Sequence, residues 1–170
     1  MTQRRPLTVN VADLLRRPGQ RRDESLEAVL AGLSVLGSKV PEDAPVQVEV
    51  HLESLNEGMV VKGTAEAPWV GECRRCLRPV EARLSSPLLE VYEAHPTEGE
   101  TQLLAGTEID LEPVAREAVL LELPLAPLCR DDCAGLCPRC GADRNEAPCG
   151  CATDEPDPRW GPLEGLRFDE

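Results

Sequence analysis

Hydrophobic and polar residues alternate strictly along residues 46–53. Every second position is apolar there: Val46, Val48, Val50 and Leu52. A period of two places these side chains on one face, which is typical of a half-buried β-strand. A turn is predicted at 56–58, and residues 59–66 predict a second strand. The two strands should be antiparallel, because so short a link cannot make a crossover.

The alternation continues in two further extended segments, at about residues 69–73 and 77–93. Together with the first two strands they predict an antiparallel meander. A helix should follow, because Asp110 can cap a helix that starts at about Leu111, and Pro124 ends it. The predicted fold class is therefore α+β: an antiparallel β-meander or partly closed barrel packed against one long helix.

The two ends of the chain have a different character from this core. Apolar residues near the start recur at helical spacing but are interrupted by glycine, so they predict no single element: Leu26, Val29, Leu30 and Leu33. Beyond Pro127 the chain is rich in Cys, Gly and Pro and cannot bury enough apolar surface to fold unaided. We expect an arginine-rich arm and further elements in 1–44, the α+β core in 45–126, and a cysteine-rich tail in 127–170. The spacing of Trp160, Leu163 and Leu166 predicts a short terminal helix in that tail.

Composition narrows the classes of function. The chain has 170 residues, enough for one core with a small appended module, and its net charge is −13. Such an acidic chain does not favour bulk nucleic-acid binding. Its four aromatic residues are scattered and therefore offer no platform on which bases could stack. His51 and His95 have no evident nucleophile beside them, and no catalytic motif is present, so we expect a non-enzymatic protein.

Eight cysteines are the main chemical clue. No apolar run near the start resembles a signal peptide, and no segment is long and apolar enough to span a membrane. We therefore expect a cytoplasmic protein without a membrane span. In that compartment thiols stay reduced, and clustered cysteines more often hold metal than form disulfides.

The C-terminal cysteines predict a zinc site. Only two residues separate Cys137 from Cys140, so one tight turn can present both sulfurs, and Gly141 permits the left-handed backbone that such a turn often needs. Cys149 and Cys151 can supply the other two ligands. A tetrahedral zinc ion would then provide the folding energy that the tail lacks.

Other groupings of the cysteines stay open. Cys129 and Cys133 could contribute to the tail site, or could form a second site with Cys73 and Cys76, so that the chain would bind one or two zinc ions. That second site would tether the tail to the sheet. Otherwise Cys73 and Cys76 are a reduced pair in a turn between strands. Iron also suits four thiolates, whereas a thioredoxin-like redox pair should precede a helix, and neither pair does.

Arginines gather in two places. Residues 1–22 carry six arginines against one aspartate, and Arg74, Arg75 and Arg78 surround the first cysteine pair. These side chains could bind the phosphates of RNA, or they could neutralise thiolates and carboxylates within the fold.

A series of motifs resembles the YceD family, the large ribosomal RNA subunit accumulation proteins. The similar segments are residues 52–63, 71–77 with the first cysteine pair, 109–111, 123–125 and 128–141. Together they cover about residues 45–151. The resemblance implies a role in the synthesis, processing or stability of 23S rRNA.

The net charge bears on how such a role would be exerted. Direct contact with rRNA normally uses basic surface, so we expect action through a protein partner, a ribosomal protein or assembly factor of the large subunit, bound by complementary charge. Direct rRNA contact by a zinc protein through its arginine clusters is the alternative. A thiol-dependent redox protein is a further alternative.

Overall fold

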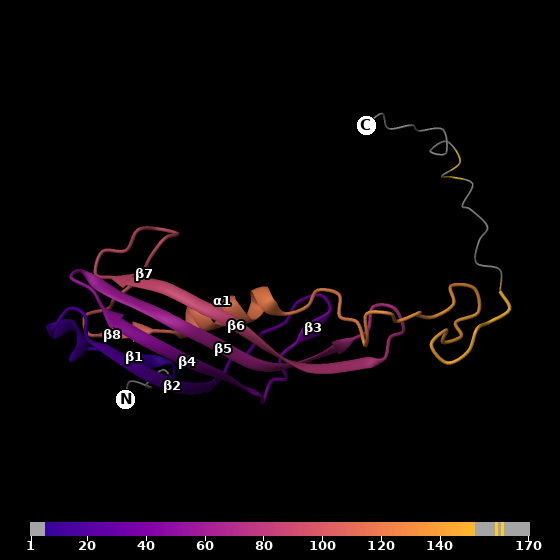
Figure 1. The fold of residues 1–170 in the computed structure, drawn as a ribbon, viewed down its shortest axis with the longest axis horizontal. Helices are drawn as coiled ribbons and strands as arrows, with labels where there is room; N and C mark the ends of the chain where they lie inside the picture. The colour runs from indigo at the N-terminus through magenta and orange to yellow at the C-terminus, as the bar shows by residue number, and fades with distance from the viewer. Residues whose placement is uncertain (1–5, 152–158, 160, 162–170) are drawn as a thin grey trace.

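Three long antiparallel strands form the centre of the molecule (Figure 1). The computed structural model describes residues 6–151, 159 and 161. Strand β4 (Pro45–Ser54) pairs with β5 (Gly58–Glu72), which pairs along its whole length with β6 (Pro79–Glu93). The predicted meander is confirmed. The segments predicted separately at 59–66 and 69–73 are one strand, because β6 supplies hydrogen-bond partners to all of it.

Short strands complete an open sheet in the described part of the chain. Its order is β2-β4-β5-β6-β7, with β2 (Arg21–Val29) antiparallel to β4 and β7 (Gln102–Leu103) parallel to β6. The two-residue strand β3 (Ser38–Lys39) pairs with the far part of β5. Since β2 and β7 are free edges, the sheet is not closed into a barrel, and the meander alternative describes it.

The N-terminal residues are built into the same core. Strand β1 (Thr8–Asn10) pairs with β8 (Glu108–Asp110), and a short 3-10 helix, η1 (Leu14–Arg16), follows it. Leu7, Val9 and Val11 are buried. The apolar residues at helical spacing belong to β2 and the loop after it, since nine residues of β2 pair with β4. Within residues 1–44, the apolar residues from Leu7 onward thus share one hydrophobic core with the sheet.

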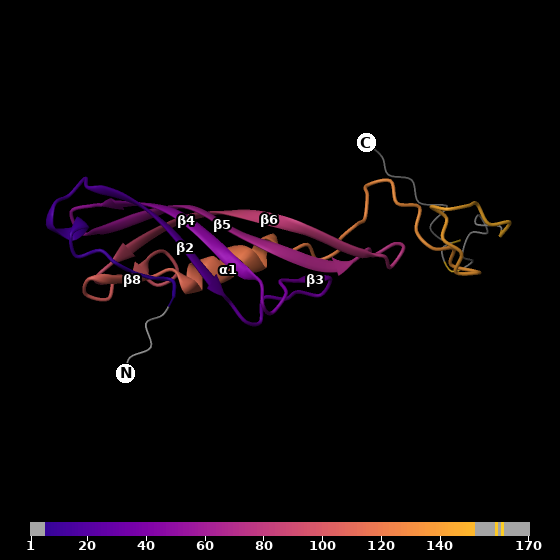
Figure 2. The same cartoon turned by 90° about the horizontal axis from the view of Figure 1, so that it is seen from below.

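One helix, α1 (Glu112–Glu122), packs across the sheet (Figure 2). It buries Val114, Ala115, Ala118 and Val119, while Leu121 on its opposite side is 79% exposed. The N-cap position is Leu111 rather than the predicted Asp110. The Asp110 side chain still contributes, because its Oδ1 accepts the backbone N–H of Glu112 at 3.0 Å. An α+β fold with a single described helix is therefore confirmed.

Alternation decides which face of the sheet is covered. The apolar positions predicted in β4 are all buried: Val46, Val48, Val50 and Leu52. Tyr92 in β6 is also buried, and its hydroxyl donates a hydrogen bond to the carbonyl of Asp110 at 2.9 Å. At Gly63 in β5 no side chain fits, since a Cβ would lie 1.9 Å from the carbonyl oxygen of Glu49. Burial of the apolar face in the shared hydrophobic core stabilises this arrangement.

The β5–β6 turn extends past α1 (Figure 1). Cys73 and Cys76 of this turn lie together with Cys129 and Cys133, and the other four cysteines form a second group. We call residues 73–78 and 127–151 the cysteine end, and residues 6–72 and 79–126 the sheet-and-helix core. The segment after α1 runs along the turn, because the backbone N–H of Arg74 donates to the carbonyl of Pro127 at 2.9 Å. The helix predicted around Trp160, Leu163 and Leu166 lies outside the described residues, as do Arg4 and Arg5.

Candidate metal centres

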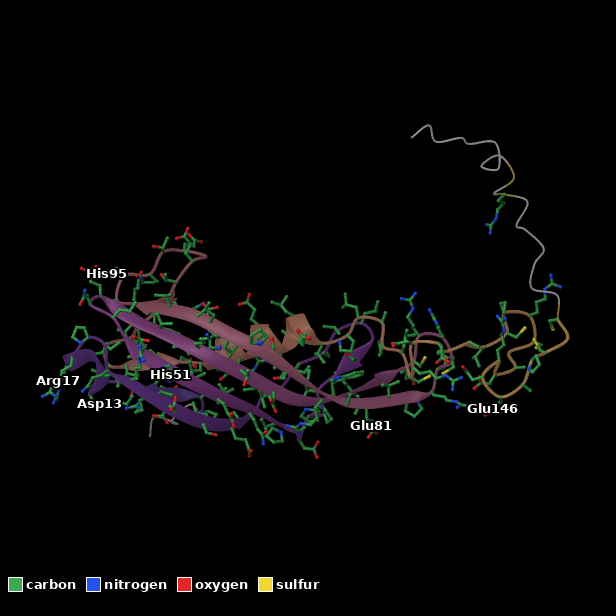
Figure 3. The ribbon with its side chains drawn as sticks, viewed as in Figure 1. Asp13, Arg17, His51, Glu81, His95 and Glu146 are labelled. Carbon is green, nitrogen blue, oxygen red and sulfur yellow. The ribbon has the colours of Figure 1, made fainter. Side chains whose placement is uncertain are left out.

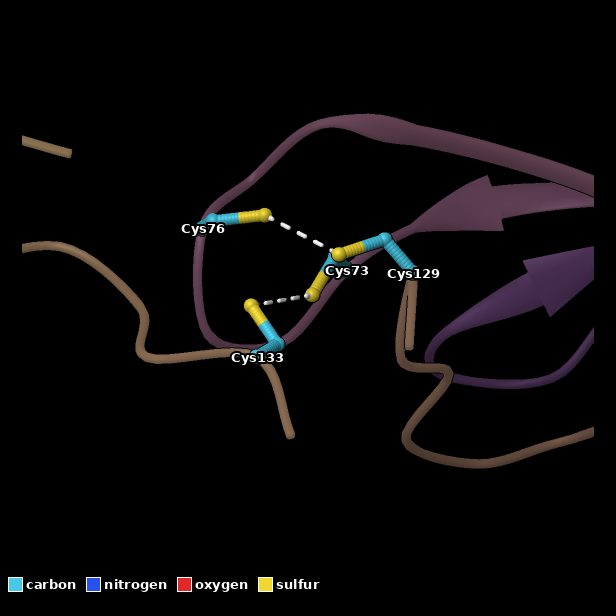
Figure 4. A group of neighbouring side chains, drawn as sticks. All are labelled: Cys73, Cys76, Cys129 and Cys133. Carbon is cyan, nitrogen blue, oxygen red and sulfur yellow. Dashed lines mark hydrogen bonds between the residues drawn. The ribbon is translucent and has the colours of Figure 1, made fainter. Parts of the chain in front are cut away.

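Four cysteines from two separate segments meet in the first centre (Figure 4). Cys73 and Cys76 come from the β5–β6 turn, and Cys129 and Cys133 come from the segment after α1. All four sulfurs lie within 4.8 Å of one another. The Cys73–Cys133 sulfur distance is 3.8 Å and the Cys76–Cys129 distance is 3.6 Å. Tetrahedral zinc with bonds of about 2.3 Å separates its sulfurs by about 3.8 Å, so the spacing suits a metal ion.

The remaining four cysteines form the second centre. Cys137, Cys140, Cys149 and Cys151 also place all their sulfurs within 4.8 Å of one another. The structure therefore brings together the four cysteines that their spacing predicts as the zinc ligands of the tail. It also pairs Cys129 and Cys133 with the hairpin cysteines, as the two-site alternative requires. Each group can hold one metal ion.

The same backbone turn presents the first two sulfurs of each centre. In the first, the N–H of Cys73 donates to the carbonyl of Arg78, and the N–H of Leu77 donates to the carbonyl of Cys73, both at 2.8 Å. In the second, the N–H of Cys137 donates to Ala142 and that of Gly141 to Cys137, again at 2.8 Å. The residue after the second cysteine has a positive φ in both turns, 61° at Leu77 and 72° at Gly141. Glycine is the expected residue there, and leucine is strained.

Backbone N–H groups in these turns favour one thiolate in each centre. Burial raises the pKa of Cys73, but hydrogen bonds from the backbone of Cys129, Cys76 and Arg75 outweigh it and lower that pKa to about 6. Hydrogen bonds from the backbone of Cys140 and Arg139 lower the pKa of Cys137 to about 6 as well. Each centre thus contains one thiol that ionises readily near neutral pH.

A second sulfur in each centre resists ionisation. Burial, together with the neighbouring sulfurs of Cys133 and Cys76, raises the pKa of Cys129 to about 12. The hydrogen bond with Cys140, with burial, raises the pKa of Cys151 to about 12. Four thiolates this close therefore cannot coexist without a cation between them. A divalent ion would remove their mutual repulsion and allow all four to ionise.

The arginines beside the first centre are mostly occupied within the protein. The Arg75 guanidinium donates to the carbonyl of Cys133 at 2.9 Å, and Arg78 forms ion pairs with Asp143, at 2.7 Å, and with Glu146. Only Arg74, of the three named from the sequence, has a side chain without a hydrogen bond or ion pair to any described residue. The sequence left two interpretations of these arginines, phosphate binding and charge neutralisation within the fold. The ion pairs of Arg78 fit the second interpretation.

One residue of the first centre's surroundings was not foreseen. Asn145, in the loop between Cys140 and Cys149, donates a hydrogen bond from Nδ2 to the sulfur of Cys133 at 3.5 Å. Nothing in its sequence position signals this contact, which exists only because the chain folds back on itself. The two histidines, by contrast, lie in the opposite part of the molecule from the sulfurs (Figure 3).

A pocket of about 610 Å³ borders the first centre. Cys73 and Arg74 line one side of it, and three exposed leucines lie along it: Leu36, Leu77 and Leu125. Exposed apolar side chains gathered around a hollow are a common mark of a protein-binding surface.

Comparison with known proteins places the chain in a family. The model of the family described as "Large ribosomal RNA subunit accumulation protein YceD" matches residues 61–167. An uncharacterized protein of Mycobacterium tuberculosis is 39% identical over 169 residues, covering 93% of this chain and 80% of the relative. An uncharacterized protein of Mycobacterium leprae is 36% identical over 173 residues, covering 95% and 77%.

A plant relative carries the family's name. It is the chloroplastic "Large ribosomal RNA subunit accumulation protein YCED homolog 1" of Arabidopsis thaliana, 40% identical over 60 residues, which are 35% of this chain and 19% of that protein. No solved structure matches the chain. Among the described residues, no helix has the length and apolar character that crossing a membrane requires. The family match includes all eight cysteines and more than half of the residues, and the chain therefore belongs to the YceD family.

Proposed function

We propose that this protein is a non-enzymatic factor for accumulation of the large-subunit rRNA, with two zinc ions folding its cysteine end and a protein partner mediating its effect. The family match over residues 61–167 is the observation that carries this proposal, because it spans both cysteine centres and names the rRNA role. The effect on 23S rRNA is exerted on its synthesis, processing or stability.

Zinc is the ion that suits these centres best. It accepts four thiolates in tetrahedral geometry, and four protein ligands leave no open position for a substrate or water. Such closed sites are structural rather than catalytic. The separation of His51 and His95 from the cysteines supports the same conclusion, because no histidine base lies beside a thiol (Figure 3).

A protein partner is favoured over direct rRNA contact by charge and by surface chemistry. The chain has a net charge of −13, and the guanidinium of Arg78 is already paired with Asp143 and Glu146. The pocket beside the first centre is lined with leucines, which suit apolar side chains of a ribosomal protein or assembly factor rather than phosphates.

Deletion of the gene tests the rRNA role. We expect 23S rRNA to fall relative to 16S rRNA, with recovery when the intact gene is returned on a plasmid. A Cys73→Ser/Cys137→Ser double variant, which loses one ligand in each centre, should fail to restore it. Unchanged 23S rRNA in the deletion strain would refute the proposed role.

Affinity purification tests the partner. A Leu36→Asp/Leu125→Asp variant should lose a large-subunit protein that the wild type retains, because charges are placed on the apolar pocket. Leu121→Asp is the matched control, since Leu121 is as exposed but lies on α1 outside the pocket. Salt-sensitive binding of purified protein to rRNA fragments, lost on Arg74→Ala, would favour direct contact instead.

A further inference from the structure

The loop of the second centre reaches back to the first. Asn145 lies between two ligands of the second centre, Cys140 and Cys149, yet its Nδ2 donates to the Cys133 sulfur of the first centre at 3.5 Å. Cys133 is 2% exposed, and the hydrogen bond from the half-buried Asn145 is partly buried. A donor directed at a metal-bound sulfur stabilises the thiolate form of that ligand.

The orientation of the Asn145 amide is fixed by its other partners. Its Oδ1 accepts the backbone N–H of Ala134 and a guanidinium N–H of Arg130, each at 2.8 Å. Neither group can accept a hydrogen bond, so an oxygen must face them and the NH₂ group must face the other way. The NH₂ group then donates to Cys133 and to Oδ1 of Asp143, the latter at 2.7 Å. All the hydrogen-bonding capacity of the amide is used.

A second contact joins the same loop to the first turn. Arg78, two residues after Cys76, pairs with Asp143 at 2.7 Å and with Glu146, and these two carboxylates flank Asn145. The backbone just before Cys137 is joined to the same turn, because the N–H of Leu136 donates to the carbonyl of Arg75 at 2.9 Å. The loop between Cys140 and Cys149 is held against the first centre by the side-chain bonds of Asp143, Asn145 and Glu146.

We propose that Asn145 couples the two centres, so that the ion in the second raises the zinc affinity of the first. This inference rests on the proposed binding of zinc at both centres. The ion in the second centre ties Cys137 and Cys140 to Cys149 and Cys151 and so closes the loop that carries Asn145. Without that ion the loop loses its closure, and Cys133 loses its donor. Linkage requires the reverse effect to be equal, so the ion in the first centre strengthens binding at the second by the same factor.

Zinc competition with a chromophoric chelator tests the coupling on the full-length chain. A Cys137→Ser/Cys140→Ser variant empties the second centre, and we expect its first centre to bind zinc about 10- to 100-fold more weakly than in wild type, the usual effect of losing an outer partner of a metal ligand. Asn145→Ala should weaken the first centre to a similar degree with all eight cysteines in place. A first-centre affinity unchanged by either variant would overturn the proposal.

A cycle of variants separates coupling from general loss of structure. Adding Asn145→Ala to the Cys137→Ser/Cys140→Ser variant should cause no further loss at the first centre, whereas fully additive effects would contradict a shared route. Arg144→Ala is the matched control, because Arg144 is exposed in the same loop and its side chain bonds to no described residue. Its zinc affinity should equal that of the wild type.

Cadmium NMR gives a readout that a merely structural residue would not move. Each four-sulfur centre should give its own resonance, and Asn145→Ala should shift the resonance of the first centre, whose sulfur loses a hydrogen bond. An unshifted resonance would overturn the role of Asn145. Elemental analysis of the wild type distinguishes the two proposals. Two zinc ions in the wild type, together with an unaltered zinc affinity in Asn145→Ala, would refute the coupling alone. No zinc in the wild type would refute both the coupling and the proposed binding of zinc.

Discussion

The sheet-and-helix core and the cysteine end are stabilised by different forces. In the core, strands, helix and N-terminal residues share one cluster of buried apolar side chains. In the cysteine end, the buried cluster of the described residues consists of Cys73, Cys76 and Cys133, and against it pack Leu128, Leu136 and, from the core strand β6, Val80. We therefore expect the core to fold by removing apolar surface from water, and the cysteine end to depend on the proposed bonds from sulfur to metal.

This difference shows how one chain can carry a segment that could not fold alone. The cysteine end borrows Cys73 and Cys76 from a hairpin that the core already holds in place. With a metal ion bound as proposed, the first centre would fix the segment after α1, and the second centre would close within that segment. We therefore expect the core to fold first, the first centre next and the second centre last.

Metal removal should separate the two regions most strongly. With a strong chelator, backbone amides of residues 129–151 should lose their protection from hydrogen exchange, while those of β4, β5 and β6 keep theirs. We expect a large effect because binding of a structural zinc ion contributes about 10–16 kcal/mol to the folding free energy of small zinc peptides. Simultaneous loss of protection in both regions would show that they are one cooperative unit.

A cavity in the core should lower the stability of the sheet and helix and leave the metal content unchanged. Leu52 is fully buried, and Leu52→Ala should lower the free energy of unfolding by about 2–5 kcal/mol. Urea denaturation followed by circular dichroism measures this, and elemental analysis should still find two zinc ions. Leu121→Ala, at an exposed position of the helix, is the control and should change stability little.

Acid should release metal before it unfolds the core. Without metal, the folded-state pKa of Cys73 is about 6, below the ordinary value of a thiol, so its thiolate favours the folded form at high pH, and zinc competes with protons for this sulfur. That advantage is lost as pH falls through about 6, when the sulfur is protonated. Titration from pH 8 to pH 4 should show zinc appearing in solution while the β-sheet dichroism stays constant. Zinc retained at pH 4 would contradict this reasoning.

The smallest expected effect compares the two turns with each other. Leu77 and Gly141 occupy equivalent positions with positive φ, so Leu77→Gly should stabilise the first centre by about 1 kcal/mol. Gly141→Ala should weaken the second by a similar amount, because a Cβ there meets no neighbour and only the backbone conformation opposes it. Chelator competition reads both changes, and effects of equal sign would show that φ is not their cause.

Much of the core could be read from periodicity. The alternation at 46–53 and 77–93 located two long strands because each has one buried face, and the helix at 112–122 fell between a capping aspartate and a proline. Strand β2 was missed because Leu26, Val29, Leu30 and Leu33 mimic a helical spacing. The environment of Leu26 and Val29 is set by pairing with β4, which a local pattern cannot reveal.

The candidate metal centres could be predicted only in part from the sequence. Two-residue spacing named Cys137 with Cys140 and Cys73 with Cys76, because each pair lies within one local turn. The grouping of Cys129 and Cys133 with the hairpin remained one alternative among several. Asn145 carried no local signal, since its partner sulfur is supplied by the fold of the chain.

The sequence by itself therefore determined the class of fold, the family and the metal-binding residue type, because period, motif order and cysteine spacing are local properties. The tertiary structure decided which sulfurs share a centre, that Arg78 is paired with Asp143 and Glu146, and that Asn145 links the two centres. These contacts join residues as much as 68 positions apart. Only the tertiary fold of the cysteine end fixes the distances between them.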